Sequence, residues 1–243
     1  ALLEAGVVVE SGLLEEDCEG QMAAFMHWCR HRRPLVTLKA STDSEGRIDV
    51  PPTEPPRRFS SDRSLELAHE IRADSMAILV GVGTVIRDDP SLTVRGPGIG
   101  PRDSPTRVVI DPDNRIPPDS KLMTQGDAPT LIVQSSETDS SGDPHHVERV
   151  VIPEREIPVA RVLDMLGDRG VQSLLVEGGA DTWSRFLSEG AVDRARICIS
   201  PIDLGGSGPV FRSSSLGESG LVLISEEDCS GDRVEWWSKE PSE

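Results

Sequence analysis

The stretch LVGVGTVIRDDPSLTVR, residues 79–95, joins an apolar run to a turn that contains glycine and acidic residues. An uninterrupted apolar run is typical of a strand that is buried on both faces of a parallel sheet. Gly83 and Thr84 follow it, and Thr84 can cap a short helix over 84–87 that the Asp-Pro pair at 89–90 ends. The stretch therefore predicts a buried strand that opens directly onto a polar turn.

Similar apolar runs recur along the chain and alternate with amphipathic segments. The runs predict strands at 34–41, 77–82, 107–111, 130–136, 149–153, 173–179 and 196–202, a short β-like run at 5–10, and a closing hairpin from 221–228 and 233–238. The amphipathic segments predict helices within 11–33 and at 60–75, 159–170 and 181–190. Apolar strands that alternate with helices form a mostly parallel sheet covered on both faces. We therefore expect an α/β fold with helices on both faces and an antiparallel hairpin at its end.

The composition excludes several classes of partner. Acidic residues outnumber basic ones 42 to 25, which gives a formal net charge of −17, and only 3% of the residues are aromatic. Such a chain lacks the basic field that nucleic acid or an anionic membrane requires, and it has few rings on which bases could stack. A small anionic ligand can still be bound by a few local cations.

The four cysteines, Cys18, Cys29, Cys198 and Cys229, are scattered and form no CxxC pair. We therefore expect neither a metal site nor a disulfide framework. No apolar run approaches the ~20 residues of a membrane-spanning helix. These features predict a protein of the cytoplasm or of an organelle interior.

Two predicted strands end in glycine-containing turns, at 81–84 and at 177–182. The second turn places Gly178 and Gly179 just before a helix that opens near Asp181 and Thr182. Glycines let backbone amides approach a phosphate, and a helix N-terminus adds partial positive charge. A tight turn without a ligand is the alternative, and the acidic turn at Asp88 likewise suits either a ribose hydroxyl or a purely structural bond.

Lys39 and Glu177 are charged residues that lie within or at the end of predicted buried strands. Buried charges usually meet a partner or a ligand. The two residues are therefore either a polar pair over a substrate or an internal ion pair.

Several motifs together indicate a family. RPLVTLKAS, LAHEIRADSMAILVGVGTVIRDDPSLTVR, RVVID, SLLVEGGADTWSRFL and LGGSGP occur in this order. They resemble the reductase domain of the riboflavin-biosynthesis deaminase/reductase, which implies a dihydrofolate-reductase-like fold. Residues 34–243 would form this reductase domain, and residues 1–33 resemble the C-terminal remnant of the preceding deaminase domain. The zinc-binding HxE and PCxxC motifs of that deaminase are absent from the chain.

The resemblance implies a reaction and the residues that carry it. NADPH would reduce the ribosyl group of 5-amino-6-(5-phosphoribosylamino)uracil to the ribitylamino product, in a homodimer. Lys39 and Glu177 would be catalytic, and Lys39, Glu177 or a water would supply the proton. The resemblance assigns cofactor contacts to Thr42, Gly83, Thr84, Asp88, Gly178, Gly179, Ala180, Asp181 and Thr182, continuing to Arg185. It assigns substrate contacts to Arg72, Leu92, Arg95 and Glu177, with the two arginines on the phosphate.

One segment departs clearly from the family pattern. The proline-rich TEPPRRF, residues 53–59, stands where the family has a GESxWI segment that contacts substrate and nicotinamide. Two alternatives therefore stay open. One is a reductase of the same fold that acts on another phosphoribosyl or pterin-like substrate, and the other is a non-catalytic nucleotide-binding homologue.

Overall fold

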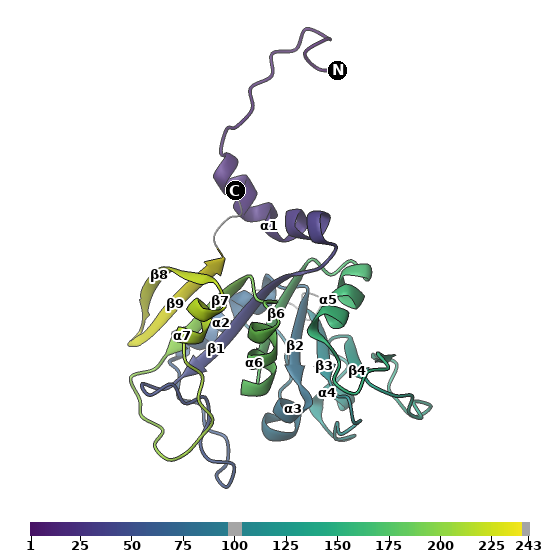
Figure 1. Ribbon diagram of the computed structural model, residues 1–243, viewed down its shortest axis with the longest axis vertical. Helices are drawn as coiled ribbons and strands as arrows, with labels where there is room; N and C mark the ends of the chain where they lie inside the picture. Colours follow the sequence, from purple (N-terminus) through teal and green to yellow (C-terminus); the bar gives the residue numbers. More distant parts are fainter. Residues whose placement is uncertain (97–103, 240–243) are drawn as a thin grey trace.

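The computed structural model describes residues 1–96 and 104–239. Among these residues nine strands form one sheet in the order β5-β4-β3-β2-β6-β1-β7-β9-β8 (Figure 1). Strands β1 to β7 are parallel, and β9 is antiparallel to both β7 and β8. The strands are β1 (Leu35–Thr42), β2 (Ala77–Gly81), β3 (Thr106–Ile110), β4 (Thr130–Gln134), β5 (Val147–Val151), β6 (Ser173–Gly178), β7 (Arg194–Ile199), β8 (Leu221–Cys229) and β9 (Asp232–Lys239). The predicted α/β class, the parallel sheet and the closing antiparallel hairpin are confirmed.

Helices cover both faces of the sheet. The helices are α1 (Glu15–His31), α2 (Asp62–Ala73), α3 (Val82–Asp88), α4 (Lys121–Thr124), α5 (Val159–Asp168), α6 (Ala180–Ser188) and α7 (Ser214–Glu218). Helices α5, α6 and α7 contribute to one buried apolar cluster, and α2, α3 and α4 contribute to the other. Since each cluster lies on its own face, the central strands are shielded from water on both sides.

Side chains of β1 alternate between these two faces. Val36, Leu38 and Ala40 are buried in the cluster of α5 and α6. Lys39 has the opposite parity, so it faces α2. In β6, Leu175 lies in the cluster of α2, and Glu177 shares its parity. The pleat thus brings Lys39 and Glu177 to the same face of the sheet.

Two local predictions are wrong. Residues 5–10 form no strand, and Figure 1 shows this segment running away from the sheet. A strand needs neighbours for its backbone groups, and none of the strands in the described part of the chain pairs with this segment. Helix α3 begins at Val82 with Gly81 as its N-cap, so Thr84 lies inside the first turn and does not cap it. No helix of the described residues is long and apolar enough to cross a membrane.

Candidate functional site

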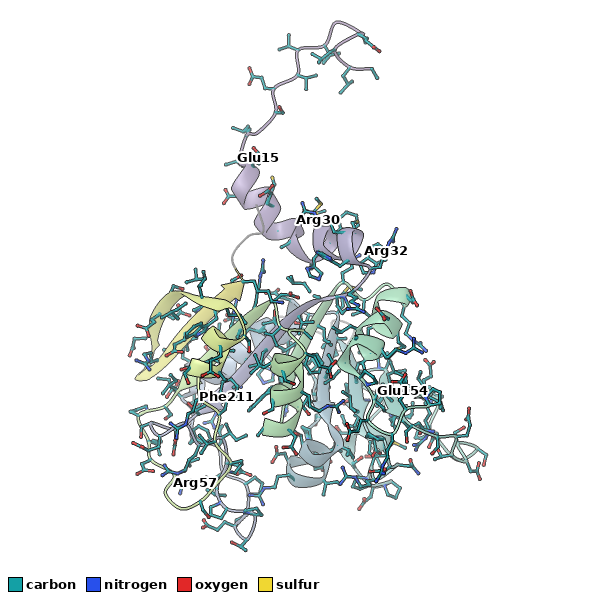
Figure 2. All side chains as sticks on the ribbon, viewed as in Figure 1. Glu15, Arg30, Arg32, Arg57, Glu154 and Phe211 are labelled. Atoms are coloured by element: carbon teal, nitrogen blue, oxygen red, sulfur yellow. The ribbon has the colours of Figure 1, made fainter. Side chains whose placement is uncertain are left out.

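A cavity of about 940 Å³ opens at the carboxyl ends of β1, β2, β3 and β6. This is the edge at which open parallel sheets bind ligands. Its walls come from α3, the first turns of α6, the loop after β3 and the loop between β1 and α2. Figure 2 shows Arg57 in the last of these loops, well beyond the edge of the sheet. The volume is at the upper end of small-molecule sites, with room for two ligands.

The glycine turn after β6 packs closely against the turn after β2. A Cβ atom at Gly178 would lie 2.7 Å from Cβ of Val80 and 3.0 Å from Oγ1 of Thr84. Gly179 has a φ of +72°, which glycine adopts without strain, and it is the N-cap of α6. The first amides of α6 have no acceptor within the helix and face the cavity edge. This arrangement fits the diphosphate of a dinucleotide.

We expect Gly178→Ala to weaken dinucleotide binding and to lower the free energy of unfolding by about 1–3 kcal/mol, because the methyl group forces β6 away from β2. Gly217→Ala, in α7 and facing open space, is the matched control and should be neutral or slightly stabilising. Urea denaturation and calorimetric titration with NADPH measure both effects. Wild-type affinity in Gly178→Ala would show that this turn does not contact the dinucleotide.

Asp88 ends α3 and lines the cavity beside an ion pair. Nε of the neighbouring Arg87 donates to Oδ2 of Asp49 at 2.7 Å, and Nη1 donates to the Pro52 carbonyl at 3.4 Å. These bonds tie the loop after β1 to α3. Burial raises the pKa of Asp88, and Asp49 raises it further against the effect of Arg87.

Glu177 forms a bidentate ion pair with Arg72 of α2. Nε of Arg72 donates to Oε1 at 2.7 Å and Nη2 donates to Oε2 at 2.6 Å. Nη1 donates to the Thr93 carbonyl at 3.2 Å. Burial opposes the charged form of Glu177, but the charge and hydrogen bonds of Arg72 outweigh it and lower the pKa of Glu177. Glu177 is therefore a carboxylate at neutral pH.

Lys39 lines the same cavity but forms no direct ion pair with Glu177. Its Nζ donates to Oγ of Ser41 at 2.9 Å, and Glu177 is paired with Arg72 instead. Burial lowers the pKa of Lys39, Glu177 raises it, and Arg72 lowers it again. The alternative of an internal Lys39–Glu177 ion pair is thus wrong, while the two side chains do face one cavity.

Three further residues expected to contact ligands, Thr42, Leu92 and Arg95, do not line the cavity. The Leu92 side chain is 2% exposed and packs in the core, with its backbone at a φ of +49°. Thr42 is buried at the end of β1. Arg95 is exposed, and its backbone amide donates to Nδ1 of His69 at 3.2 Å. Gly83, Thr84, Gly179, Ala180, Asp181 and Thr182 line the cavity directly.

His69 lies one turn before Arg72 on α2 and was not predicted as a site residue. Because its Nδ1 accepts the Arg95 amide, the proton of the neutral ring is on Nε2. Burial lowers the pKa of His69, Arg72, Arg95 and Lys39 lower it further, and Glu177 raises it. The ring is thus neutral at physiological pH.

Acidification should release the Arg95 backbone, because a protonated Nδ1 cannot accept its amide. The pKa of His69 in the folded state lies below its unfolded value of 6.5. The stabilisation by neutral His69 is therefore present above pH 6.5 and is lost as the pH falls from 6.5 through the folded-state pKa. We expect the free energy of unfolding to fall less between pH 7.5 and 5.5 in His69→Asn than in the wild type, by about 1 kcal/mol for one hydrogen bond. Identical pH dependence in the two proteins would contradict this role.

The cavity wall also carries cations that sequence patterns did not single out. The lining cations are Lys39, Arg57, Arg58, Arg87, Arg115 and Arg185. Of these six, the family resemblance assigns a role only to Lys39 and Arg185. The lining acids are Asp49, Asp88, Asp113, Glu177 and Asp181. Six cations against five acids make this wall far less acidic than the whole chain, so anionic ligands can bind there.

The family described as the RibD C-terminal domain matches residues 34–228. The riboflavin biosynthesis protein RibD of Aquifex aeolicus is 30% identical over 225 residues, which are 93% of this chain and 61% of that protein. The 2,5-diamino-6-ribosylamino-4(3H)-pyrimidinone 5′-phosphate reductase of Methanothermobacter thermautotrophicus is 35% identical over 181 residues, which are 72% of this chain and 81% of that protein. The chain thus spans about three fifths of the RibD relative and most of the archaeal reductase.

Solved structures give the same result for the fold. A diaminohydroxyphosphoribosylaminopyrimidine deaminase/5-amino-6-(5-phosphoribosylamino)uracil reductase from Thermotoga maritima superposes with a TM-score of 0.84 at 25% identity, covering 98% of this chain and 65% of that one. A dihydrofolate reductase from Enterococcus faecalis superposes with a TM-score of 0.51 at 12% identity, covering 85% of this chain and 97% of that one. The expected dihydrofolate-reductase-like fold is confirmed.

Proposed function

The chain belongs to the family of RibD C-terminal domains, and on that premise we propose that it is an NADPH-dependent reductase of riboflavin biosynthesis. Its reaction reduces the ribosyl group of 5-amino-6-(5-phosphoribosylamino)uracil to the ribitylamino product. The observation that carries the proposal is one cavity that holds Lys39 and Glu177 beside the glycine turn at Gly179 and the N-terminus of α6.

The cofactor half of the cavity is formed by the turns after β2 and β6. The family and the fold indicate a nicotinamide cofactor, and NADPH is the form that we assign. When bound, the cofactor supplies the hydride. Gly179 and the first amides of α6 hold its diphosphate, and Asp88 faces a ribose from the end of α3. Thr84 lies between these two turns, 3.1 Å from where a Gly179 Cβ would stand.

The substrate half lies toward α2. In this assignment Arg95 supplies the charge for the substrate phosphate, and Leu92 contributes through its backbone. Arg72 donates hydrogen bonds to Glu177 and to the Thr93 carbonyl, so its main role is to orient Glu177. Its positive charge also attracts the substrate phosphate. Glu177 accepts a hydrogen bond from the open ribose or its imine.

Lys39 is the group that we assign as proton donor to the imine nitrogen. Glu177 is ionised at neutral pH and has no proton to give. Burial lowers the pKa of the Lys39 ammonium below its ordinary value, which makes this group a stronger acid than an exposed lysine. Its bond to Ser41 fixes the direction of Nζ. Hydride transfer then needs only orientation and one proton from the protein.

A second candidate substrate is 2,5-diamino-6-ribosylamino-4(3H)-pyrimidinone 5′-phosphate, the pyrimidine in the name of the archaeal relative. This candidate is favoured because the chain is 35% identical to that reductase and covers 81% of it, against 30% and 61% for RibD of Aquifex aeolicus. It differs in the pyrimidine ring and shares the phosphoribosyl group, so the same phosphate and ribose contacts would serve.

We also propose the organisation of the whole protein. Residues 1–33 belong to the end of a preceding deaminase domain and residues 34–243 to the reductase domain, of which 97–103 and 240–243 lie outside the described residues. Helix α1 is fastened to the reductase by Nε1 of Trp28, which donates to the Gly167 carbonyl at 2.9 Å. The protein pairs as a homodimer, a proposal supported by the edge strand β8, where Val222, Leu223 and Ile224 are exposed.

The test is cofactor oxidation by the purified chain, followed by absorbance, with each of the two pyrimidines and with NADPH or NADH. We expect turnover that depends on the uracil substrate and prefers NADPH. Turnover with the diamino-pyrimidinone alone would favour the second candidate. NADPH binding without turnover of either would leave another phosphoribosyl or pterin-like substrate, or a non-catalytic homologue, in its place.

A further inference from the structure

The turn after β3, residues 111–116, is held rigidly at the cavity edge. The buried carboxylate of Asp111 accepts the backbone amides of Arg115 and Ile116, each at 2.8 Å. The amide of Asn114 donates to the Asp111 carbonyl at 3.3 Å, and its side chain accepts from Arg149 at 2.5 Å. The backbone of Arg115 is therefore fixed while its exposed side chain lines the cavity.

The position of this turn follows from the strand order β3-β2-β6-β1. Lys39 lies on β1, the two glycine turns follow β6 and β2, and Arg115 follows β3. Three interstrand steps of about 4.8 Å separate β1 from β3. A dinucleotide whose reacting ring lies by Lys39 and whose diphosphate crosses the glycine turns places its adenosine at Arg115.

Arg115 differs in its contacts from most other cations of the cavity wall. Arg87 pairs with Asp49 and Arg58 pairs with Asp62. Arg185 donates to the Ile157 carbonyl from Nη2. Within residues 1–96 and 104–239, no carboxylate lies within ion-pair distance of the Arg115 guanidinium. Its donors are thus available to an anion of the ligand.

The acidic residues of the turn determine which anionic group of the ligand can bind at Arg115. An acidic residue that binds the ribose hydroxyls at a strand end favours NADH. An arginine at such a position instead accommodates the 2′-phosphate of NADPH. Asp111 holds such a strand-end position, but both of its oxygens are occupied by backbone amides. Asp113 lines the cavity beside Arg115 and is exposed, so water screens its repulsion of a phosphate.

We propose that Arg115 binds the 2′-phosphate of the adenosine ribose and thereby makes the site selective for NADPH over NADH. The inference rests on the proposed function, because it takes the cofactor site as given. A guanidinium fork donates two hydrogen bonds to a phosphate dianion and none of comparable strength to a ribose hydroxyl. Arg115 is therefore a specificity-determining residue of the cofactor site.

Calorimetric titration of the full chain with NADPH, NADH and the fragment 2′,5′-ADP tests this role without any turnover. Arg115→Ala should weaken NADPH and 2′,5′-ADP binding by about 10- to 100-fold and leave NADH within about twofold. Arg115→Lys should recover part of the loss, since it restores the charge without the fork. Arg30→Ala on α1, at the far side of the molecule from Arg57 in Figure 2, is the matched control and should change none of the affinities.

Three results would overturn the inference: equal loss of NADPH and NADH affinity in Arg115→Ala, unchanged NADPH affinity, or a wild type that binds both cofactors equally. In each of these cases the reductase assignment stands. A folded wild type that binds neither dinucleotide would instead overturn the proposed function itself, and the inference with it.

Discussion

Lys39→Met is expected to lower kcat for the reduction by about 10²- to 10⁴-fold while leaving NADPH affinity within about twofold. A methionine side chain is similar in length to that of lysine but has no ammonium group. The variant therefore lacks the group that we assign as the proton donor. Lys39 lies in the substrate half of the cavity and not in the glycine turns, so dinucleotide binding should persist. Stopped-flow kinetics and NADPH titration separate the two quantities.

Ser41→Ala is the graded control for this prediction, because it removes the hydrogen bond at Nζ of Lys39 and leaves the ammonium in place. We expect a loss of kcat of no more than about tenfold. The pH profile supplies a second readout. Because the ammonium is the acid, kcat should fall as the pH rises through the lowered pKa of Lys39, and this limb should be absent in Lys39→Met. A limb that persists would assign the proton to another group.

Glu177→Gln is expected to cost about 3 kcal/mol in the free energy of unfolding and to abolish most of the activity. The change leaves Arg72, 15% exposed, without its counter-charge, and breaking a buried pair on one side is strongly destabilising. It also removes the charge that raises the pKa of Lys39. Because the pKa of Glu177 is lowered in the folded state, the stabilisation is present above the unfolded 4.5 and is lost as the pH falls through the folded value.

The chain offers a matched control for this prediction in Glu148→Gln. Glu148 forms a bidentate pair with Arg169 at 2.6 and 3.0 Å, but the two side chains are 57% and 40% exposed. Such a surface pair contributes about 1 kcal/mol at most. Urea denaturation should therefore separate the two variants by about 2 kcal/mol. Equal losses would mean that burial adds nothing to the pair at Glu177.

Much of the sheet could be predicted because each central strand is a run of apolar residues bounded by turns. The runs at 77–82 and 107–111 gave strands β2 and β3 within one or two residues. Residues 5–10 have similar composition, yet they form no strand, since strand formation depends on neighbours that composition does not reveal. Helices α4 and α7 went unpredicted because four or five residues are too short to show a helical period.

The glycine turns and the two buried charges at the cavity could be singled out from the sequence, but the ion pairs around them could not. Glu177 pairs with Arg72, which is 105 residues away in the chain, so no local spacing signals the contact. Arg115 and Arg57 lie on loops, where neither apolar period nor capping marks a residue that faces a cavity. Their placement follows from which strand each loop leaves, and that depends on the strand order of the whole sheet.

The most direct test of the account is the fate of the hydride. NADPH carrying deuterium at C4 of the nicotinamide, on the face used by the enzyme, should be incubated with the chain and the phosphoribosylaminouracil. We expect one deuterium at C1′ of the ribityl group in the product, detected by mass spectrometry. A reduced product without deuterium, from cofactor labelled on either face, would contradict the claim that this cavity brings the two ligands together for direct transfer.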